Sequence, residues 1–378
     1  MKPLMKLGAA AITTALALTL AACGGGISSP GGDTTSTAGG ALPVKAEVVL
    51  RYSTQHTENT PFSRATQRWA DLVAERTEGR VGVELYYSAS LLPAAEVLPG
   101  IIDGRAETGF VVDTMFPDML PLTNASSIPF DRTNGVAQAK AYQELYNTNE
   151  AFKAEFEKLG VHILMFQPSG ASSLGSGSEI KTLADVQGKS IRCLGYICDA
   201  LQGVGANPVA IASNEIYEAM DRDTIDGWAA YPFMDIVATQ FQEVTPYVTD
   251  PGIGTYIQPF SPINLETWES LSPEDQQILT ELGTEYHAIM AEEMNSLETE
   301  TCTATGEAGV VLSTMSDADV ATWRDTVHQG IYDTWVADAT GKTDIDPAGF
   351  YAELTSQYES ALADTDFTSG YADCAGQS

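Results

Sequence analysis

Residues 181–232 carry the most informative pattern in the chain. They read KTLADVQGKSIRCLGYICDALQGVGANPVAIASNEIYEAMDRDTIDGWAAYP. Apolar runs alternate here with helix-like segments, so we expect strands at 190–194, 208–211 and 224–228, and helices at 197–203 and 214–221. Connections of a few residues between such elements are typical of βαβ units, whose helices cover a parallel sheet.

The same alternation occurs closer to the N-terminus. We expect strands at 48–52, 81–87 and 108–112, and helices at 61–78 and 95–102. Thr60 and Pro61 indicate a helix start, because threonine caps a helix and proline suits its first turn. A helical stretch at 134–159 and a strand at 161–166 follow, and a run of small residues at 169–178 marks a crossing between two lobes.

A long helical pattern begins at Ser272 and Pro273 and continues to about residue 304. At 1.5 Å per residue, about 30 residues span about 45 Å, which is enough to cross both lobes. The sequence therefore predicts an α/β fold with two lobes, mainly parallel sheets and a long helix that spans them. Lobe one takes residues 44–168 and about 255–290, and lobe two takes residues 169–254 and about 291–378.

The first 22 residues have the composition of an export signal. Lys2 and Lys6 flank the start of an apolar stretch at 7–20, which is shorter than the roughly 18–20 residues of a membrane-spanning helix. The stretch leads into Leu-Ala-Ala-Cys at 20–23, a lipobox pattern, so Cys23 is the predicted lipidation site; an ordinary cleaved signal is the alternative. Residues 23–43 would then form a lipid anchor and a flexible tether rich in Gly, Ser, Thr and Pro.

The charge of the chain excludes some partners. Lys and Arg number 19 against 51 Asp and Glu, which gives a net charge of −32. Nucleic acid and anionic lipid surfaces repel such a chain, so we expect no nucleic-acid partner. Membrane attachment would come from the lipid anchor.

Catalytic motifs are missing from the sequence. Its four histidines form no HExxH helix, and no GxSxG elbow, GxxxxGK[ST] loop or GxGxxG turn occurs. Asp221, Asp223 and Asp226 lack the glycine and glutamate of a calcium loop. The sequence therefore predicts a protein that is not an enzyme and that uses no metal and no cofactor.

Four cysteines follow Cys23, namely Cys193, Cys198, Cys302 and Cys374. An even number in an exported chain favours disulfides, and three pairings are possible. The local pairing joins Cys193 to Cys198 and Cys302 to Cys374. Four buried free thiols are the alternative.

Several spaced motifs resemble one family of transport proteins. They are Leu-Ala-Asp-Val-Gln-Gly-Lys at 183–189 leading into Ile191 and Arg192, Gly-Ala-Asn-Pro-Val at 205–209, Glu-Ile-Tyr-Glu-Ala-Met at 215–220 and Thr-Ile-Asp-Gly at 224–227. The segments at 69–81 and 268–275 look like the family's first helix with its second strand and the start of its long helix. Over about residues 46–370, the chain resembles the DctP-like substrate-binding proteins of tripartite ATP-independent periplasmic (TRAP) transporters.

The resemblance implies a periplasmic-binding-protein-like fold whose two lobes close on a ligand. It also implies an extracytoplasmic receptor, in the periplasm or at the cell surface, that delivers an organic acid to the small and large membrane subunits of a TRAP permease. We expect a monomer. The alternative is an extracellular ligand-binding lipoprotein that serves a sensor or another transporter class.

Arg192 is the central candidate for ligand binding. In the family an arginine at this position pairs with the ligand carboxylate, and the resemblance implies that role here. Independently, a guanidinium offers two parallel donors to a carboxylate, and α/β sheets bind ligands in the crevice at the carboxyl ends of their strands. The alternative is a surface ion pair with one of the 51 acidic residues.

The chain departs from the family near this arginine. A second arginine expected after Gly170 is replaced by Ala171, Ser172 and Ser173. The family's Asp-Gly-Gln-Glu-Asn-Pro reads Asp-Gly-Trp-Ala-Ala-Tyr-Pro at 226–232. We therefore expect a less cationic, more aromatic pocket that takes a monocarboxylate with an apolar or aromatic body.

Four residues follow from these departures as candidate ligand contacts. Trp228 and Tyr231 would stack on the ligand, or would only pack the hinge. Ser172 would offer a hydroxyl. Tyr196, in the shortened segment after the arginine, would add to the aromatic wall.

Two further candidates lie in lobe one. His56 follows the first strand, where a ligand contact and a packing role are both possible. Asp113 follows the third strand and would accept a ligand hydroxyl or a water, or would cap a helix.

Overall fold

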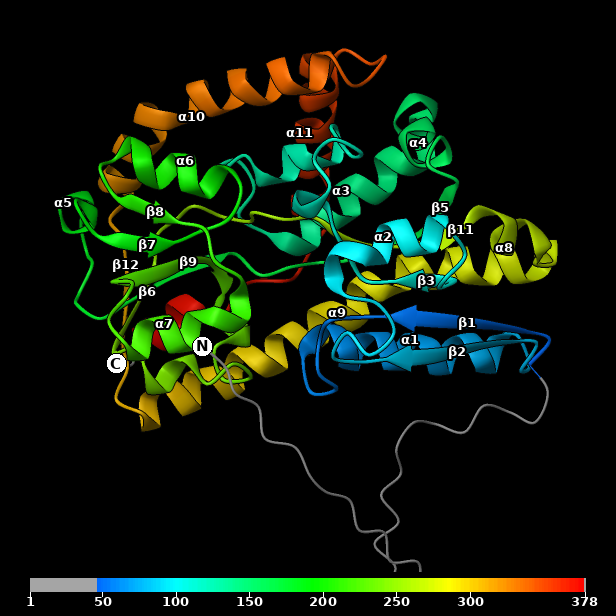
Figure 1. Ribbon diagram of the computed structural model, residues 1–378, viewed down its shortest axis with the longest axis horizontal. Coiled ribbons are helices and arrows are strands. Elements are labelled where there is room, and N and C mark those ends of the chain that lie inside the picture. Colours follow the sequence, from blue (N-terminus) through cyan, green and yellow to red (C-terminus); the bar gives the residue numbers. More distant parts are fainter. Residues whose placement is uncertain (1–45, 377–378) are drawn as a thin grey trace, which may run out of the picture. The chain divides into compact units, whose positions relative to one another are not determined.

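The computed structural model describes residues 46–376. The predicted signal, the lipidation site Cys23 and the tether lie outside these residues. The described part of the chain forms two six-stranded sheets with helices packed around them (Figure 1). Among its helices, none combines the length and apolarity that a membrane span requires.

The first sheet has the strand order β2–β1–β3–β11–β4, with β5 paired to β11. Leu50 and Tyr52 of β1 are buried in a core that also receives side chains from α1 and α9. Thr60 caps α1 as predicted, because its hydroxyl accepts the Ser63 N–H at 3.3 Å. The elements of this region are β1 (Val48–Ser53), α1 (Pro61–Arg76), β2 (Val81–Tyr86), α2 (Ala94–Ile102), β3 (Thr108–Gly109), β4 (Val111–Val112), η1 (Asp113–Met115), η2 (Thr123–Ser127), α3 (Gly135–Thr148), α4 (Glu150–Glu157), β5 (Val161–Phe166), β11 (Pro259–Asn264) and α8 (Leu265–Ser270).

The second sheet has the strand order β12–β10–β6–β9–β7–β8. Its βαβ unit is β7–α6–β8, in which Arg192 at the end of β7 lies opposite Val209 of β8. The elements are β6 (Ser172–Ser176), α5 (Leu183–Val186), β7 (Ser190–Arg192), α6 (Tyr196–Gly203), β8 (Asn207–Val209), η3 (Ser213–Glu215), α7 (Ile216–Asp221), β9 (Gly227–Pro232), η4 (Phe233–Asp235), η5 (Phe241–Glu243), β10 (Tyr247–Asp250) and β12 (Val311–Thr314).

The predicted α/β fold with two sheet-centred lobes is confirmed, but the sheets are mixed rather than mainly parallel. Strand β1 pairs in parallel with β2 and β3, and β7 pairs in parallel with β8 and β9. By contrast, β6 is antiparallel to β9 and β10, and β11 is antiparallel to β3, β4 and β5. Both strands enter one sheet directly from the other, and a strand that arrives without a crossover helix is free to pair antiparallel.

The predicted long helix is confirmed as α9 (Pro273–Glu307), which has 35 residues. At 1.5 Å per residue it is about 50 Å long. Its N-cap is Ser272, whose hydroxyl accepts the Asp275 N–H at 3.1 Å. The helix packs against α1 and β5 near the first sheet, and against η4 and α12 (Tyr371–Ala375) near the second (Figure 1).

Gly283 allows α9 to approach the first sheet closely. A Cβ atom at this position would lie 2.0 Å from the backbone oxygen of Leu164 in β5. We expect Gly283→Ala to destabilise the protein by about 1–3 kcal/mol, the usual cost of overpacking a core. Gly306→Ala in the same helix meets no atom within 4 Å and should be neutral or stabilise by up to about 1 kcal/mol. Urea unfolding of both variants tests this, and equal effects would contradict it.

Two helices after β12 pack on helices of both lobes. Helix α10 (Asp317–Thr340) packs on α6, and Trp323 Nε1 donates to Ala200 O at 2.8 Å. Helix α11 (Pro347–Ala363) packs on α3, and Trp335 Nε1 of α10 donates to Pro121 O at 2.9 Å. Because these helices bridge the two regions, the lobe boundaries given above stay a prediction.

The structure contains the local pairing of the four cysteines. Cys193 is bonded to Cys198 next to β7, and Cys302 of α9 is bonded to Cys374 of α12. The second bond joins residues 72 positions apart, so it ties α12, near the C-terminal end of the described chain, to the long helix.

Candidate ligand-binding site

Arg192 ends strand β7 and is 1% exposed. Its Nε donates to Ile211 O at 3.1 Å, and its Nη1 donates to Ala229 O at 3.2 Å and to Ala230 O at 3.0 Å. Within residues 46–376, Arg192 forms no ion pair, and its Nη2 makes no hydrogen bond. A buried guanidinium without an acidic partner is costly, so this side chain is suited to receive an anion.

Two tyrosines lie close to this guanidinium. Burial lowers the pKa of Arg192, and the nearby hydroxyls of Tyr256 and Tyr231 oppose that lowering. Burial also raises the pKa of Tyr256 and of Tyr231 far above the ordinary value, so both stay neutral hydroxyls. Arg192 thus stands beside two polar groups that could orient an acid next to it.

Trp228 and Tyr231 lie on β9, in different environments. The Trp228 ring is 0% exposed; its Nε1 donates to Thr245 Oγ1 at 3.0 Å, and it contacts the rings of Tyr231 and Phe241. Trp228 therefore packs the core of the second lobe in this structure, and the expected stacking of a ligand on it does not fit this placement. Tyr231 packs at 4.9 Å from Phe241 but also lies beside Arg192.

Ser172 has an internal partner for its hydroxyl. Its Oγ accepts the Ala230 N–H at 3.0 Å, and the residue is 1% exposed. Ala230 has a left-handed backbone, with φ at 55°, and also offers its carbonyl to Arg192. Ser172 therefore supports the backbone of β9 at the residue that holds Arg192, and does not present its hydroxyl to the solvent.

His56 follows β1 in the first lobe, between two phenylalanine rings. Its ring stacks on Phe62 at 5.0 Å and meets Phe110 edge-on at 4.6 Å. Burial lowers the pKa of His56 to about 4, so the imidazole is neutral at pH 7. Its Nε2 has no hydrogen-bond partner among the described residues, which leaves one polar atom for a ligand or a water.

Asp113 is fully buried in η1 and holds neighbouring segments together. Its Oδ1 accepts the Gln258 N–H at 2.9 Å, and its Oδ2 accepts the hydroxyl of Ser126 in η2. Burial raises the pKa of Asp113 to about 7. Both oxygens are engaged within the protein, so the expected contact with a ligand hydroxyl does not fit this arrangement.

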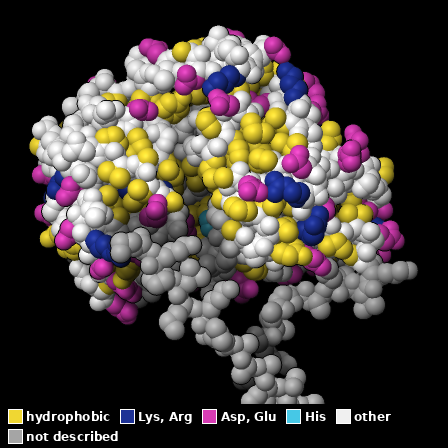
Figure 2. All heavy atoms as spheres, in the orientation of Figure 1, with side chains coloured by type: hydrophobic (Ala, Val, Ile, Leu, Met, Phe, Trp, Pro, Cys, Tyr) yellow, Lys and Arg dark blue, Asp and Glu magenta, His cyan; other side chains and the backbone are white. Residues whose placement is uncertain are grey.

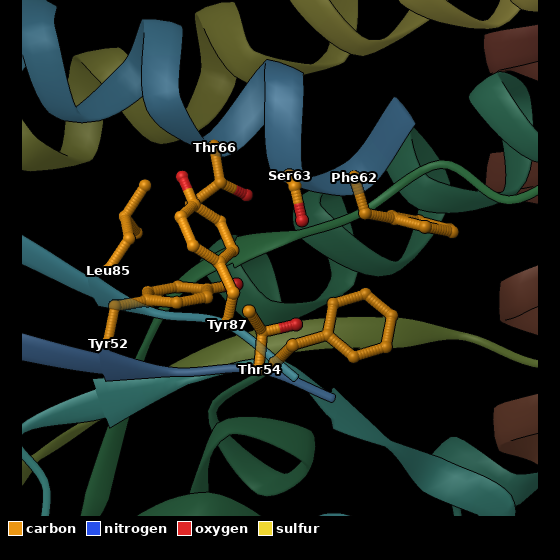
Figure 3. A pocket seen from close by; sticks show the side chains of 8 residues that line it. Tyr52, Thr54, Phe62, Ser63, Thr66, Leu85 and Tyr87 are labelled. Atoms are coloured by element: carbon orange, nitrogen blue, oxygen red, sulfur yellow. The ribbon is translucent and has the colours of Figure 1, made fainter. Parts of the chain in front are cut away.

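A narrow recess lies between β1, β2 and α1, next to His56. It is too narrow to admit a water molecule. Figure 3 shows side chains of the strands directed toward Ser63 and Thr66 of α1. The lining residues are Tyr52, Thr54, Phe62, Ser63, Thr66, Leu85, Tyr87 and Phe110. This recess is a packing gap in the first lobe, and we assign it no ligand.

The two lobes meet beside Arg192. Tyr196, at the start of α6, is partly buried, and its pKa rises to about 12, chiefly through burial and also through nearby Asp338 and Asp199. Gly195 precedes it, and a Cβ there would lie 3.9 Å from Thr114 and 4.0 Å from Ser127 of the first lobe. In the orientation of Figure 1, Figure 2 shows the surface hollowed between the regions of the two sheets.

The sequence matches a known protein family over most of its length. Residues 52–337 match the family model DctP, described as "Bacterial extracellular solute-binding protein, family 7". The chain belongs to this family. It is a substrate-binding protein of the TRAP type, and the proteins of this family are extracytoplasmic transport components rather than enzymes.

Relatives of this TRAP receptor are similar along most of their length. The 2,3-diketo-L-gulonate-binding periplasmic protein YiaO of Escherichia coli is 26% identical over 78% of this chain and 89% of its own. A TRAP solute-binding protein of Rhodoferax ferrireducens, solved with copurified benzoate, has a TM-score of 0.74 at 19% identity and covers 84% of this chain and 99% of its own. A marine metagenome TRAP protein described as specific for aromatic acid ligands has a TM-score of 0.73 at 20% identity, over 83% and 99%.

The sequence missed Tyr256, which interacts with Arg192, and Asp235, which interacts with the two tyrosines of this TRAP receptor's site. Tyr256 lies in the irregular link between β10 and β11, where no periodic pattern marks it. Asp235 ends η4, is 8% exposed, and has an Oδ1 without a hydrogen-bond partner in the described part of the chain. The charge of Asp235 contributes to the raised pKa of Tyr231 and of Tyr256.

Asp235 should make the stability of the TRAP receptor depend on pH. Burial raises its pKa to about 7, whereas an unfolded aspartate titrates near about 3.9. Between these values the folded chain holds a proton that the unfolded chain has lost, so stability falls as pH rises through this window. Asp235→Asn should reduce that fall by roughly 2–4 kcal/mol between pH 4 and pH 8.

Urea unfolding at several pH values measures this effect. Asp113 and Glu155, whose pKa values burial also raises to about 7, keep titrating in the variant, so part of the pH dependence should remain. An unchanged pH dependence in Asp235→Asn would show that the carboxyl is not buried as described.

Proposed function

We propose that this TRAP receptor binds an organic acid, specifically a monocarboxylate with an apolar or aromatic body, between its two lobes. Arg192 binds the carboxylate, and the hydroxyls of Tyr231 and Tyr256 orient it. The aromatic group of His56, Phe62 and Phe110 in the first lobe faces the body of the ligand.

The observation that carries this proposal is the state of Arg192. It is fully buried, has no acidic partner within residues 46–376, and leaves Nη2 without a hydrogen bond. Three carbonyl oxygens hold the rest of the guanidinium, so the orientation of Nη2 is fixed before a ligand arrives. A carboxylate would complete this set with a charge-assisted hydrogen bond.

The ligand class is supported by two further points. No second arginine stands at 170–173. The site therefore offers positive charge for one ligand carboxylate, and not for two. The similar TRAP proteins described with benzoate and with aromatic acids share the fold of this chain. YiaO, which is described as binding 2,3-diketo-L-gulonate, leaves an aliphatic monocarboxylate as the other outcome.

Membership of the family supports delivery of the ligand to a membrane permease. The loaded receptor would dock on the small and large membrane subunits of a TRAP permease. Lipidation of Cys23 would keep it at the membrane, and it would act as a monomer.

A thermal-shift screen of the purified protein tests the ligand class. The panel contains benzoate, phenylacetate, mandelate, gluconate, succinate and malate. A ligand at 100-fold its Kd adds about 2.7 kcal/mol of stability, which a melting curve detects. We expect the largest shift with an aromatic monocarboxylate. A shift with the two dicarboxylates alone would refute the ligand class.

A further inference from the structure

The segment directly after Arg192 is a small covalently closed loop. Cys193 follows the arginine and is bonded to Cys198 in the first turn of α6, with their Cα atoms 5.2 Å apart. We call residues 193–198 the disulfide loop. Two hydrogen bonds reinforce it, from Ile197 N to Leu194 O at 3.2 Å and from Cys198 N to Gly195 O at 3.0 Å. The loop is therefore rigid and is fixed to the strand end that carries the ligand-binding arginine.

The tip of the disulfide loop lies close to the first lobe. Gly195 has φ 50° and ψ −143°, a backbone conformation that side chains rarely allow. The atoms nearest to a Cβ built there are Thr114 Cγ2 of η1 at 3.9 Å and Ser127 Cβ of η2 at 4.0 Å. Asp113 bonds to Ser126, so the two short helices form one receiving surface. Only two residues, Cys193 and Leu194, separate Gly195 from Arg192.

Exposed apolar side chains flank the contact on both sides. Leu194 on the loop is 38% exposed, and Met115 beside Thr114 is 44% exposed. They are two of only four large apolar side chains that are exposed in the described part of the chain. Burying them when the lobes draw together would favour the closed state.

We propose that the disulfide loop is the closing contact of the receptor. A carboxylate on Arg192 would fix the strand end, and the loop would transmit that position to η1 and η2, so that ligand capture and lobe closure occur together. The Cys193–Cys198 bond keeps the loop in its docking shape before closure, which lowers the ordering cost of binding. This inference rests on the proposed function of Arg192 as the carboxylate-binding residue.

The chain provides a matched control for the test. Cys193→Ala/Cys198→Ala opens the disulfide loop, and Cys302→Ala/Cys374→Ala removes the other bond, which is remote from the contact. Hydrogen–deuterium exchange of residues 113–127, measured by mass spectrometry without ligand, should become faster in the first variant only. Calorimetric titration with the tightest acid of the panel should show an affinity about tenfold or more lower in the first variant and nearly unchanged in the second.

A pair of glycines gives a second test. Gly195→Ala and Gly205→Ala both place a side chain at positive φ, 50° and 91°, at the two ends of α6. A Cβ built at Gly205 would meet, among the described residues, only Gln187 of its own lobe within 4 Å. Because both changes strain the backbone, both should lower stability, but only Gly195→Ala should weaken binding.

The outcomes separate the two claims. If the wild-type protein binds no acid, the proposed function fails, while the exchange of residues 113–127 still tests the contact. If exchange in that segment is the same in wild type and in Cys193→Ala/Cys198→Ala, or rises equally in both double variants, the closing role is overturned. The same holds if wild type binds an acid and opening the loop leaves its affinity unchanged.

Discussion

Replacing Arg192 by methionine should weaken the binding of an organic acid by about 30-fold to several thousand-fold, because removing one partner of a buried charge pair costs roughly 2–5 kcal/mol. Methionine keeps the apolar part of the side chain and removes all five donors. The ligand carboxylate would then be buried without its cation. Isothermal titration of wild type and variant with the same acid gives the ratio directly.

Arg192 also supports the second lobe, so stability must be measured beside affinity. Its donors satisfy the carbonyls of Ile211, Ala229 and Ala230, and their loss should lower the free energy of unfolding by about 1–3 kcal/mol. Arg80→Met is the matched control, because Arg80 pairs with Asp275 at 2.7 Å on the outside of the first lobe. The affinity of this variant for the acid should match that of the wild type. If Arg192→Met binds as tightly as wild type, the carboxylate lies elsewhere.

Removing the Cys302–Cys374 bond should lower the free energy of unfolding by about 4 kcal/mol. The bond joins residues 72 positions apart, and a loop of that length loses much of its freedom in the unfolded chain when it is closed. In the folded state it ties α12 to α9, next to Tyr371, whose hydroxyl donates to Val248 O at 2.8 Å. The prediction applies to Cys302→Ala/Cys374→Ala under non-reducing conditions.

The shorter bond provides the comparison. Cys193 and Cys198 are five positions apart, so their removal should cost only about 2 kcal/mol in the same chain-entropy estimate. Urea unfolding of the two double variants measures both losses. A larger loss for the short loop than for the long one would contradict the account based on loop length.

The parts of the fold that depend on local signals were predictable. Thr60 and Ser272 cap α1 and α9 as expected, because a cap requires only residues within one turn. The long helix follows from its own periodicity. The antiparallel course of β6 and β11 was not predictable, because it depends on how the chain passes from one sheet to the other.

The role of Trp228 shows where sequence reasoning fails. The sequence predicted a strand at 224–228, whereas β9 comprises Gly227–Pro232. This strand places Trp228 opposite Gly175 of β6. A Cβ on Gly175 would lie 2.1 Å from the indole, so that glycine makes room for the ring in the core. A pairing between positions 53 residues apart leaves no trace in the local pattern of either strand.

The site residues divide in the same way. Arg192 could be singled out because a family motif surrounds it and because its chemistry suits an acid. Tyr256 could not, because its interaction with Arg192 exists only after two distant segments meet. Asp235 could not, because it interacts with the two tyrosines and not with Arg192 itself. Ser172 and Asp113 were candidates by position, but their oxygens are engaged by Ala230 and by Gln258 and Ser126.

A crystal structure of the receptor with the tightest acid of the panel tests the central claim most directly. We predict the ligand between the two sheets, with one carboxylate oxygen about 2.7–2.9 Å from Arg192 Nη2 and the body of the acid toward His56. A ligand bound away from Arg192, with Nη2 still without an anion, would contradict the account.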